Sequence, residues 1–443
     1  MNFASTLRVA SRGSGDGSRN SVTPVPGRGD RSVTVYNAAW VLPIAAPPIA
    51  DGWVSVESGR IAGVGAGRRT DAVDLGRVVV LPALVNAHTH LELSYLRGQV
   101  PPASRFLDWV RPLMAARREP GGEAQLQAAR AGIAEARASG TGLVGDISNT
   151  LATVALLREA AMPARVFYEL LGFSAADPAG LVRDARERIR AHTDADVRVA
   201  LAPHAPYSVS TGLLSALRED LDRHPGDLST VHVSESPEEI ELILRGTGPW
   251  RDQLIALGVW SDHWLAPGVS PVSYLAESGF LDSRVLAVHG VQCSGDDLAR
   301  LRTLGVTLVS CPRSNRHVGV GDPPLDAFYA TGVKVAFGTD SLASAPDLNM
   351  FGELEAAREV AARVSARDLL ASATLVGATA LGFEHELGSI EVGKRGALIA
   401  VQLSDRVRDV EEYLVSGIEP DMIRWVEPEQ VATHPVTPSP HLA

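Results

Sequence analysis

The chain has 443 residues, enough for about three average domains or for one large barrel with an accessory piece. Hydrophobic residues make up 45% and charged residues 21% of it, which excludes a mostly disordered chain. The net charge of −11 argues against nucleic acid and anionic membranes as main partners. No stretch reaches the ~18 consecutive apolar residues of a membrane helix. Because there are only two cysteines, Cys293 and Cys311, we expect a protein of the reducing cytoplasm.

The two ends of the sequence predict a small domain of their own. Residues 1–30 are rich in Gly, Ser and Arg and have no hydrophobic period, so we expect a disordered extension there. Short β-like runs fill 31–80, and a similar run returns at 388–403. We therefore expect a small β-sandwich domain built from 31–80 and 385–435, flanking a central unit over 81–384.

The central unit alternates apolar strand-like runs with amphipathic helical stretches. Eight such units over about 300 residues predict an α/β fold of the TIM type, a (β/α)8 barrel. A doubly wound sheet is the main alternative. Polar clusters end nearly every strand, however, and barrels build active sites at the carboxyl ends of their strands. The eight runs are VVVLPALVNAHTH, TGLVGDIS, ARVFYELLG, VRVALAPHA, STVHVSES, RVLAVHGVQ, VTLVSCPRSN and KVAFGTDS.

Histidines and acidic residues gather at the predicted carboxyl ends of four of these strands. The first ends with His88 and His90, whose side chains point the same way because residues two apart share one face of a strand. Burying several imidazoles and a carboxylate together without a metal is costly, and neutral imidazole is a common ligand for zinc and iron. The sequence therefore predicts a metal site. The later strands contribute His232, Glu235, His289 and Asp340.

The motifs PALVNAHTH, PHAPYS, HVSE, VHG, CPRSN and GTDS together resemble the amidohydrolase superfamily of metal-dependent hydrolases, and within it the cytosine/adenosine-type deaminases. The resemblance implies that His88, His90, His232 and Asp340 hold one divalent metal, Zn²⁺ or alternatively Fe²⁺. Binuclear members usually bridge their metals with a lysine at the end of strand four. No lysine lies near that position here, so we expect a single metal.

The same resemblance gives catalytic roles to three residues. His289 would hydrogen-bond the metal-bound water or the substrate atom under attack. Asp340 would accept the proton of that water, and Glu235 would carry protons to the ring nitrogen and to the departing ammonia. Glu235 has an alternative interpretation as a helix-start carboxylate, because SESPEEI is also typical of a helix N-terminus.

Substrate contacts follow from the residues around this group. The form H-x-H-L-E-x-S resembles the aminodeoxyfutalosine deaminases, in which Glu92 would accept hydrogen bonds from ribose or ring groups. Glu92 has an alternative role in orienting a ligand histidine. The resemblance implies that His204 contacts the substrate rather than only capping its strand. Arg105, Arg313 and Arg316 are candidates to pair with a substrate carboxylate, and we favour Arg313. Ser314 and Asn315 would shape the pocket.

The resemblance thus implies a hydrolytic deaminase of an adenine-type nucleoside, with aminodeoxyfutalosine, of menaquinone biosynthesis, as the favoured substrate. The alternatives are deaminases of S-adenosylhomocysteine, methylthioadenosine, guanine or cytosine, and hydrolases of ring amides or chlorotriazines. A metal-retaining scaffold without catalysis ranks last, because every residue of the catalytic group is present. The resemblance also implies a homo-oligomer, a dimer, with a small-molecule substrate.

Overall fold

The computed structural model of the chain describes residues 33–117, 122–404 and 407–426. The extension expected over 1–30 lies outside these residues, as does the end of the segment 385–435. Among the described helices, none combines the length and the hydropathy needed to cross a membrane.

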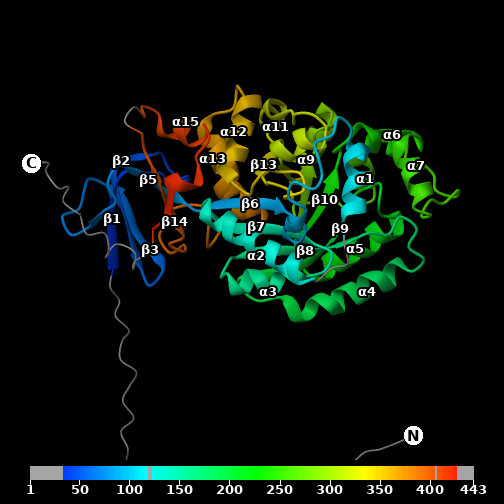
Figure 1. Cartoon of the computed structure of the whole chain (residues 1–443), viewed down its shortest axis with the longest axis horizontal. Coiled ribbons are helices and arrows are strands. Elements are labelled where there is room, and N and C mark those ends of the chain that lie inside the picture. Colours follow the sequence, from blue (N-terminus) through cyan, green and yellow to red (C-terminus); the bar gives the residue numbers. More distant parts are fainter. Residues whose placement is uncertain (1–32, 118–121, 405–406, 427–443) are drawn as a thin grey trace, which may run out of the picture. The chain divides into compact units, whose positions relative to one another are not determined.

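Two four-stranded parallel sheets form the centre of the fold (Figure 1). Their orders are β6-β7-β8-β9 and β10-β11-β12-β13, so strands that follow one another in the chain are neighbours in each sheet. Nearly every strand residue is buried, as is typical of parallel strands covered by helices. Each of the eight predicted runs contains one of these strands, and the α/β class is confirmed. The strands are β6 Leu84–Thr89, β7 Thr141–Ser148, β8 Ala164–Leu170, β9 Val197–Pro203, β10 Ser229–Val233, β11 Val285–His289, β12 Thr307–Ser310 and β13 Lys334–Phe337.

A mixed sheet contains strands from both ends of the described chain. Its order is β15-β14-β5-β1-β2-β3, and β4 pairs with β1. The first predicted run divides at Ala83, so that β5 joins this sheet and only β6 joins a parallel sheet. Figure 1 shows the late strand β14 beside the early strands. The strands are β1 Val33–Val41, β2 Ile49–Glu57, β3 Arg60–Ala66, β4 Val73–Asp74, β5 Val78–Pro82, β14 Leu398–Gln402 and β15 Ile423–Trp425.

Helices connect the parallel strands and begin at serines in several places. Ser210, Ser236 and Ser294 each accept a hydrogen bond from a backbone N–H in the first turn of the helix that follows, which satisfies one of its unpaired donors. The helices are α1 Phe106–Ala116, α2 Glu123–Ala138, α3 Ala152–Glu159, α4 Pro178–Ile189, α5 Thr211–Arg223, α6 Pro237–Arg245, α7 Pro249–Ala256, α8 Pro271–Glu277, α9 Gly295–Leu304, α10 Pro312–His317, α11 Leu325–Thr331, α12 Met350–Val360, α13 Ala366–Ala371, α14 Gly377–Ala380 and α15 Val410–Leu414. Shorter helical turns are η1 Leu91–Leu96, η2 Arg190–His192, η3 Ser372–Val376 and η4 Pro420–Met422.

Backbone hydrogen bonds join the two parallel sheets at the carboxyl ends of their edge strands. The amide of His232 in β10 donates to the carbonyl of His204, just after β9, at 2.9 Å. At the other edge the amide of Asp340, after β13, donates to the carbonyl of His88 in β6 at 3.0 Å. The residues predicted to hold a metal therefore lie at the places where the sheets meet.

The packing of β7 against β6 predicts a strict requirement for glycine at position 145. A Cβ there would lie 2.4 Å from the carbonyl oxygen of Ala87 and 2.8 Å from Leu381, and backbone cannot yield as a side chain does. We expect Gly145→Ala to lower the free energy of unfolding by about 1–3 kcal/mol. Gly226→Ala is the matched control, because a Cβ at 226 has no neighbour within 4 Å. Equal unfolding midpoints for the two variants would contradict this packing.

Candidate metal centre

Side chains from the carboxyl ends of β6, β10, β11 and β13 converge in one buried cluster. The ring centroid of His88 lies 5.0 Å from that of His90, 4.9 Å from that of His232 and 5.8 Å from that of His289. Asp340 Oδ1 lies 3.5 Å from His90 Nε2 and 3.9 Å from His88 Nε2. The structure thus brings together five residues that the sequence placed on four separate strands.

The backbone around this cluster is strained. Ser234, His289 and Asp340 have φ values of 51°, 74° and 60°, in the left-handed region that residues other than glycine rarely adopt. Each such residue costs on the order of 1–3 kcal/mol, and strain of this kind concentrates at functional sites. The three positions lie at or just beyond strand ends, so the strain turns the chain where its side chains enter the cluster.

Hydrogen bonds fix the orientation and the proton positions of the cluster. The Nδ1–H of His232 donates to the carbonyl of His204 at 2.9 Å, which leaves Nε2 with a free lone pair. The Asn315 amide donates to Nδ1 of His289 at 3.0 Å, so the proton of this ring is on Nε2. Ser314 Oγ donates to Asp340 Oδ2 at 2.6 Å. Ser314 and Asn315, expected in a loop, lie in the short helix α10.

Burial keeps the imidazoles neutral. It lowers the pKa of His90 to about 3, and it lowers the pKa of His232 to about 4. The pKa values of His88 and His289 are also well below the usual range because of burial, followed by the neighbouring histidines. At neutral pH all four rings are therefore neutral, and neutral imidazole is the form that binds a metal.

The donor set fits a divalent metal ion. Both ring nitrogens of His88 are buried and have no hydrogen-bond partner in the described part of the chain, and an unpaired buried polar group costs about 1–3 kcal/mol. Ligand atoms of His88, His90 and Asp340 lie within 4.8 Å of one another, as do those of His88, His232 and His289. A set of imidazole nitrogens and one carboxylate oxygen suits zinc or ferrous iron.

Glu235 lies beside the cluster as a buried carboxyl group. Its Oε1 is 3.5 Å from Nε2 of His289. Burial raises its pKa well above the usual range, and the nearby charges of Asp340 and Glu239 add to this. Its alternative role at the start of a helix is wrong, because the residue that caps α6 is Ser236.

Three buried carboxyl groups of this region were missed by the sequence reasoning. Asp146 in β7 accepts hydrogen bonds from the amide of Leu91, just after the ligand strand, and from Thr153 Oγ1. Glu169 in β8 has an oxygen 3.6 Å from His232 Nδ1. Glu239 in α6 accepts from two backbone amides at the end of β10. A single acidic residue inside an apolar run was the available signal for Asp146 and Glu169.

Apolar residues from the loops beyond the strand ends pack around the site. Tyr207 stacks on Trp250 with ring centroids 4.1 Å apart, and its ring lies 5.6 Å from that of His204. Phe106 and Trp109 of α1 are buried in the same apolar cluster as Tyr207 and Trp250. This apolar cluster therefore reaches the ring of His204, next to the metal centre.

Glu92 and His204 lie near the metal centre, and each has hydrogen-bond partners within the chain. Glu92 accepts hydrogen bonds from the hydroxyls of Ser148 and Thr150 and from the amide of Asn149, at 2.8–2.9 Å, and so holds the loop between β7 and α3. Among the described residues it makes no hydrogen bond to a histidine. His204 has Nδ1 2.6 Å from Ser208 Oγ, and its ring centroid is 5.0 Å from that of His232.

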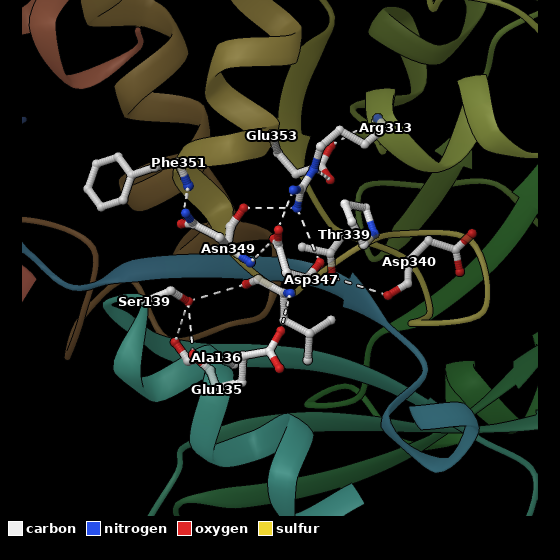
Figure 2. A network of polar contacts seen from close by, with 12 residues as sticks. Glu135, Ala136, Ser139, Arg313, Thr339, Asp340, Asp347, Asn349, Phe351 and Glu353 are labelled. Atoms are coloured by element: carbon white, nitrogen blue, oxygen red, sulfur yellow. Dashed lines mark hydrogen bonds and ion pairs between the residues drawn. The ribbon is translucent and has the colours of Figure 1, made fainter. Parts of the chain in front are cut away.

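The guanidinium of Arg313 is held by hydrogen bonds to other residues of the chain (Figure 2). Its Nε donates to Glu353 at 2.6 Å and its Nη1 to Asp347 at 2.8 Å, while Nη2 donates to the carbonyls of Asp347 and Asn349. A substrate carboxylate would have to displace these contacts. Arg313 is therefore not among the substrate contacts that we propose.

Comparison with known proteins places the chain in a family. Residues 79–423 match the model of the amidohydrolase family. The chain belongs to this family. An aminodeoxyfutalosine deaminase of Deinococcus radiodurans is 35% identical over 317 residues, which cover 69% of this chain and 73% of that protein. As a member of the family with deaminase relatives, the chain is a hydrolase that acts on C–N bonds.

Two further relatives broaden the comparison. A 5-methylthioadenosine/S-adenosylhomocysteine deaminase of Teredinibacter turnerae is 30% identical over 354 residues, 76% of this chain and 74% of that protein. The crystal structure of an adenosine deaminase from Xanthomonas campestris with bound zinc has a TM-score of 0.75 and 28% identity, covering 88% of this chain and 90% of that one. All three relatives are named as deaminases.

The buried Asp146 predicts a pH-dependent contribution to stability. Burial raises its pKa from 3.8 to about 7, so between these pH values the folded chain binds more protons at this residue than the unfolded chain does. Its contribution to stability is therefore present at low pH and is lost as pH rises to about 7. We expect the stability of Asp146→Asn relative to the parent to rise over this window, because the amide cannot ionise. Thermal unfolding from pH 4 to 8 at one fixed metal loading measures the difference, and a pH-independent difference would contradict the burial of this carboxyl group.

Proposed function

We propose that the chain is a mononuclear metal-dependent deaminase that hydrolyses the 6-amino group of an adenine-type nucleoside. The observation that carries this proposal is the position of Glu235. It is a buried carboxyl group with a raised pKa, next to His289 and to a donor set that fits one metal ion. A carboxyl group outside the metal ligands that can carry a proton is what deamination of a nucleobase requires.

In this proposal His88, His90, His232 and Asp340 hold the metal, with zinc as the favoured ion and ferrous iron as the alternative. The zinc in the similar adenosine deaminase supports zinc. When bound, the metal supplies a water molecule activated for nucleophilic attack at neutral pH. The serine hydroxyl on Asp340 Oδ2 keeps that carboxylate in place and leaves Oδ1 toward the histidines.

The remaining steps are proton transfers by residues of the chain. Burial raises the pKa of Glu235 and so favours its protonated form, from which it can protonate the purine ring nitrogen as C6 is attacked. Once ionised, it can take the proton of the hydroxyl group that has added to C6 and deliver it to the amino group, which leaves as ammonia. His289 presents its Nε2–H, set by the amide of Asn315, to the oxygen that adds to C6.

The proposal includes the architecture around the site. The two parallel sheets would close into one (β/α)8 barrel, and the hydrogen bonds from His232 to His204 and from Asp340 to His88 support this closure. Residues 31–80 and 385–435 would form the accessory β-domain, which the pairing of β14 with β5 supports. A cytoplasmic location and a dimeric assembly remain expectations.

For the substrate we propose an adenine nucleoside with a substituent at the 5′ position. The relative from Deinococcus favours aminodeoxyfutalosine, as does the H-x-H-L-E-x-S form of residues 88–94. The relative from Teredinibacter supports methylthioadenosine or S-adenosylhomocysteine equally well. Glu92, His204 and the pocket-shaping pair Ser314 and Asn315 would line the purine and ribose region.

Metal content tests the ligand assignment. We expect the purified protein to bind one equivalent of zinc and His88→Asn to lose it, because His88 lies at the centre of the donor set. His224→Asn, a half-exposed histidine at the end of α5, is the control and should keep the metal. Elemental analysis after gel filtration gives the stoichiometry, and circular dichroism checks the fold. A variant that folds and retains a full equivalent would remove His88 from the site.

Turnover tests the role of Glu235. The metal-loaded enzyme should convert the ultraviolet spectrum of an adenine nucleoside to that of hypoxanthine. Glu235→Gln should lower kcat by about 10²–10⁴-fold with unchanged metal content, because the amide cannot transfer the proton. Glu241→Gln, in the helix α6 that follows Glu235, is the control and should be active. Full activity of Glu235→Gln would falsify the proton-transfer role, and loss of the metal would reassign the residue to metal binding.

A further inference from the structure

Glu235 faces the metal centre because the chain turns just before it. Side chains alternate along a strand, so if β10 continued, a residue three positions after His232 would point to the opposite face. Instead, Glu235 Oε1 lies 3.5 Å from Nε2 of His289, and the ring of His289 stacks on that of His232 with centroids 5.4 Å apart. Ser234 has the left-handed φ of 51° that redirects the chain. The direction of the Glu235 side chain therefore depends on the backbone of Ser234.

The two carboxylate oxygens of Glu239 hold this turn. Oε1 accepts from the amide of Ser234 and Oε2 from the amide of Glu235, each at 2.9 Å. These two amides flank the Cα of Ser234, so fixing both of them fixes its φ and ψ together. The carbonyl of Ser234 is held separately by the amide of Gln292 at 2.8 Å. A left-handed residue other than glycine persists where its surroundings determine it, and Glu239 does so from the N–H side.

This is not the usual task of an acidic residue in the first turn of a helix. In a capping box, the third helical residue accepts from the amide of the residue that caps the helix. The helix α9 has this arrangement, because Asp297 accepts from the amide of its cap Ser294 at 3.0 Å. Glu239 has the same position relative to its cap Ser236, but its oxygens reach past the cap to the amides of the two preceding residues.

Glu239 is placed to act through Glu235 and not on the substrate itself. Its side chain is fully buried, and both of its oxygens are occupied by backbone amides. Its charge also acts on Glu235: burial is the main cause that raises the pKa of Glu235, and Asp340 and Glu239 add to it. Any effect of Glu239 on the reaction should therefore disappear when Glu235 cannot transfer a proton.

We propose that Glu239 is a positioning residue for deamination, which holds the backbone of Ser234 and Glu235 so that the Glu235 carboxyl group stays within reach of the substrate ring nitrogen. The inference rests on the proposed function and goes beyond it. It assigns the geometry of the proton-carrying residue to a side chain that lies in the following helix and binds only backbone in this turn.

The test is a double-mutant cycle on the zinc-loaded enzyme. The substrate is whichever of methylthioadenosine, adenosine and aminodeoxyfutalosine the parent converts fastest. The cycle compares the kcat, KM and zinc content of the parent, Glu239→Gln, Glu235→Gln and the double variant. Glu239→Gln keeps the shape of the side chain but turns an amide N–H toward one of the two backbone donors. Asp297→Asn is the matched control, because this buried residue has the same position in α9 and its hydrogen bonds go to Ser294 and Ser270.

We expect Glu239→Gln to lower kcat by about 10–100-fold, because misplacing a catalytic group by about 1 Å has an effect of this size. KM should stay within about twofold of the parent value and the zinc content should not change. In the Glu235→Gln background the same substitution should lower kcat by less than about twofold, since no proton-carrying residue remains to be positioned. Asp297→Asn should keep the kcat of the parent.

Four results would overturn the assignment. They are an equal fold-loss of kcat in both backgrounds, an unchanged kcat in Glu239→Gln, a loss of zinc from Glu239→Gln, and a loss of kcat in Asp297→Asn as large as that in Glu239→Gln. The first of these would mean that Glu239 supports the fold in general and not Glu235 in particular.

A failure of the proposed function gives a different result, because the zinc-loaded parent then deaminates none of the three nucleosides. The role of Glu239 is in that case judged by hydrogen exchange of single backbone amides, measured by mass spectrometry for the parent and Glu239→Gln. Exchange at Ser234 and Glu235 that becomes at least about tenfold faster, with the rest of β10 unchanged, would support Glu239 as the residue that holds this turn. Unchanged exchange at both amides would overturn it.

Discussion

The exclusion of water from a cluster of imidazoles and carboxyl groups is the constraint on which the site depends. Burial lowers the pKa values of the ligand histidines and raises that of Glu235, so one physical effect favours both the neutral imidazoles that bind a metal and a protonated carboxyl group beside them. The same burial leaves the nitrogens of His88 without partners among the described residues, a cost that a metal ion would offset. The strained φ values of His289 and Asp340 belong to this arrangement, because they direct these side chains into the cluster.

A surrounding layer of hydrogen bonds keeps the cluster in one geometry. Ser314 and Asn315 hold Asp340 and His289, and Glu239 fixes the backbone that carries Glu235. Partners of this kind orient the ligands and set which ring nitrogen carries the proton. Rigid support matters here, because proton transfer requires the acid within hydrogen-bond reach of the substrate atom.

The sequence predicted the parts of the fold that depend on local pattern. The eight strand runs and the positions of His88, His90, His232 and Asp340 at strand ends could be read from it, because buried parallel strands are continuous apolar runs followed by polar residues. The partners of Arg313 could not be read from it, because Glu353 and Asp347 are 40 and 34 residues away and only the fold brings them together.

The central claim is that one metal ion is held by three histidines and one aspartate. Anomalous diffraction from crystals of the zinc-loaded protein, collected on both sides of the zinc absorption edge, tests this most directly. We expect a single anomalous peak in contact with His88, His90, His232 and Asp340. A peak among Glu169, His204 and His232 instead, which also have convergent ligand atoms, or two peaks of equal height, would contradict it.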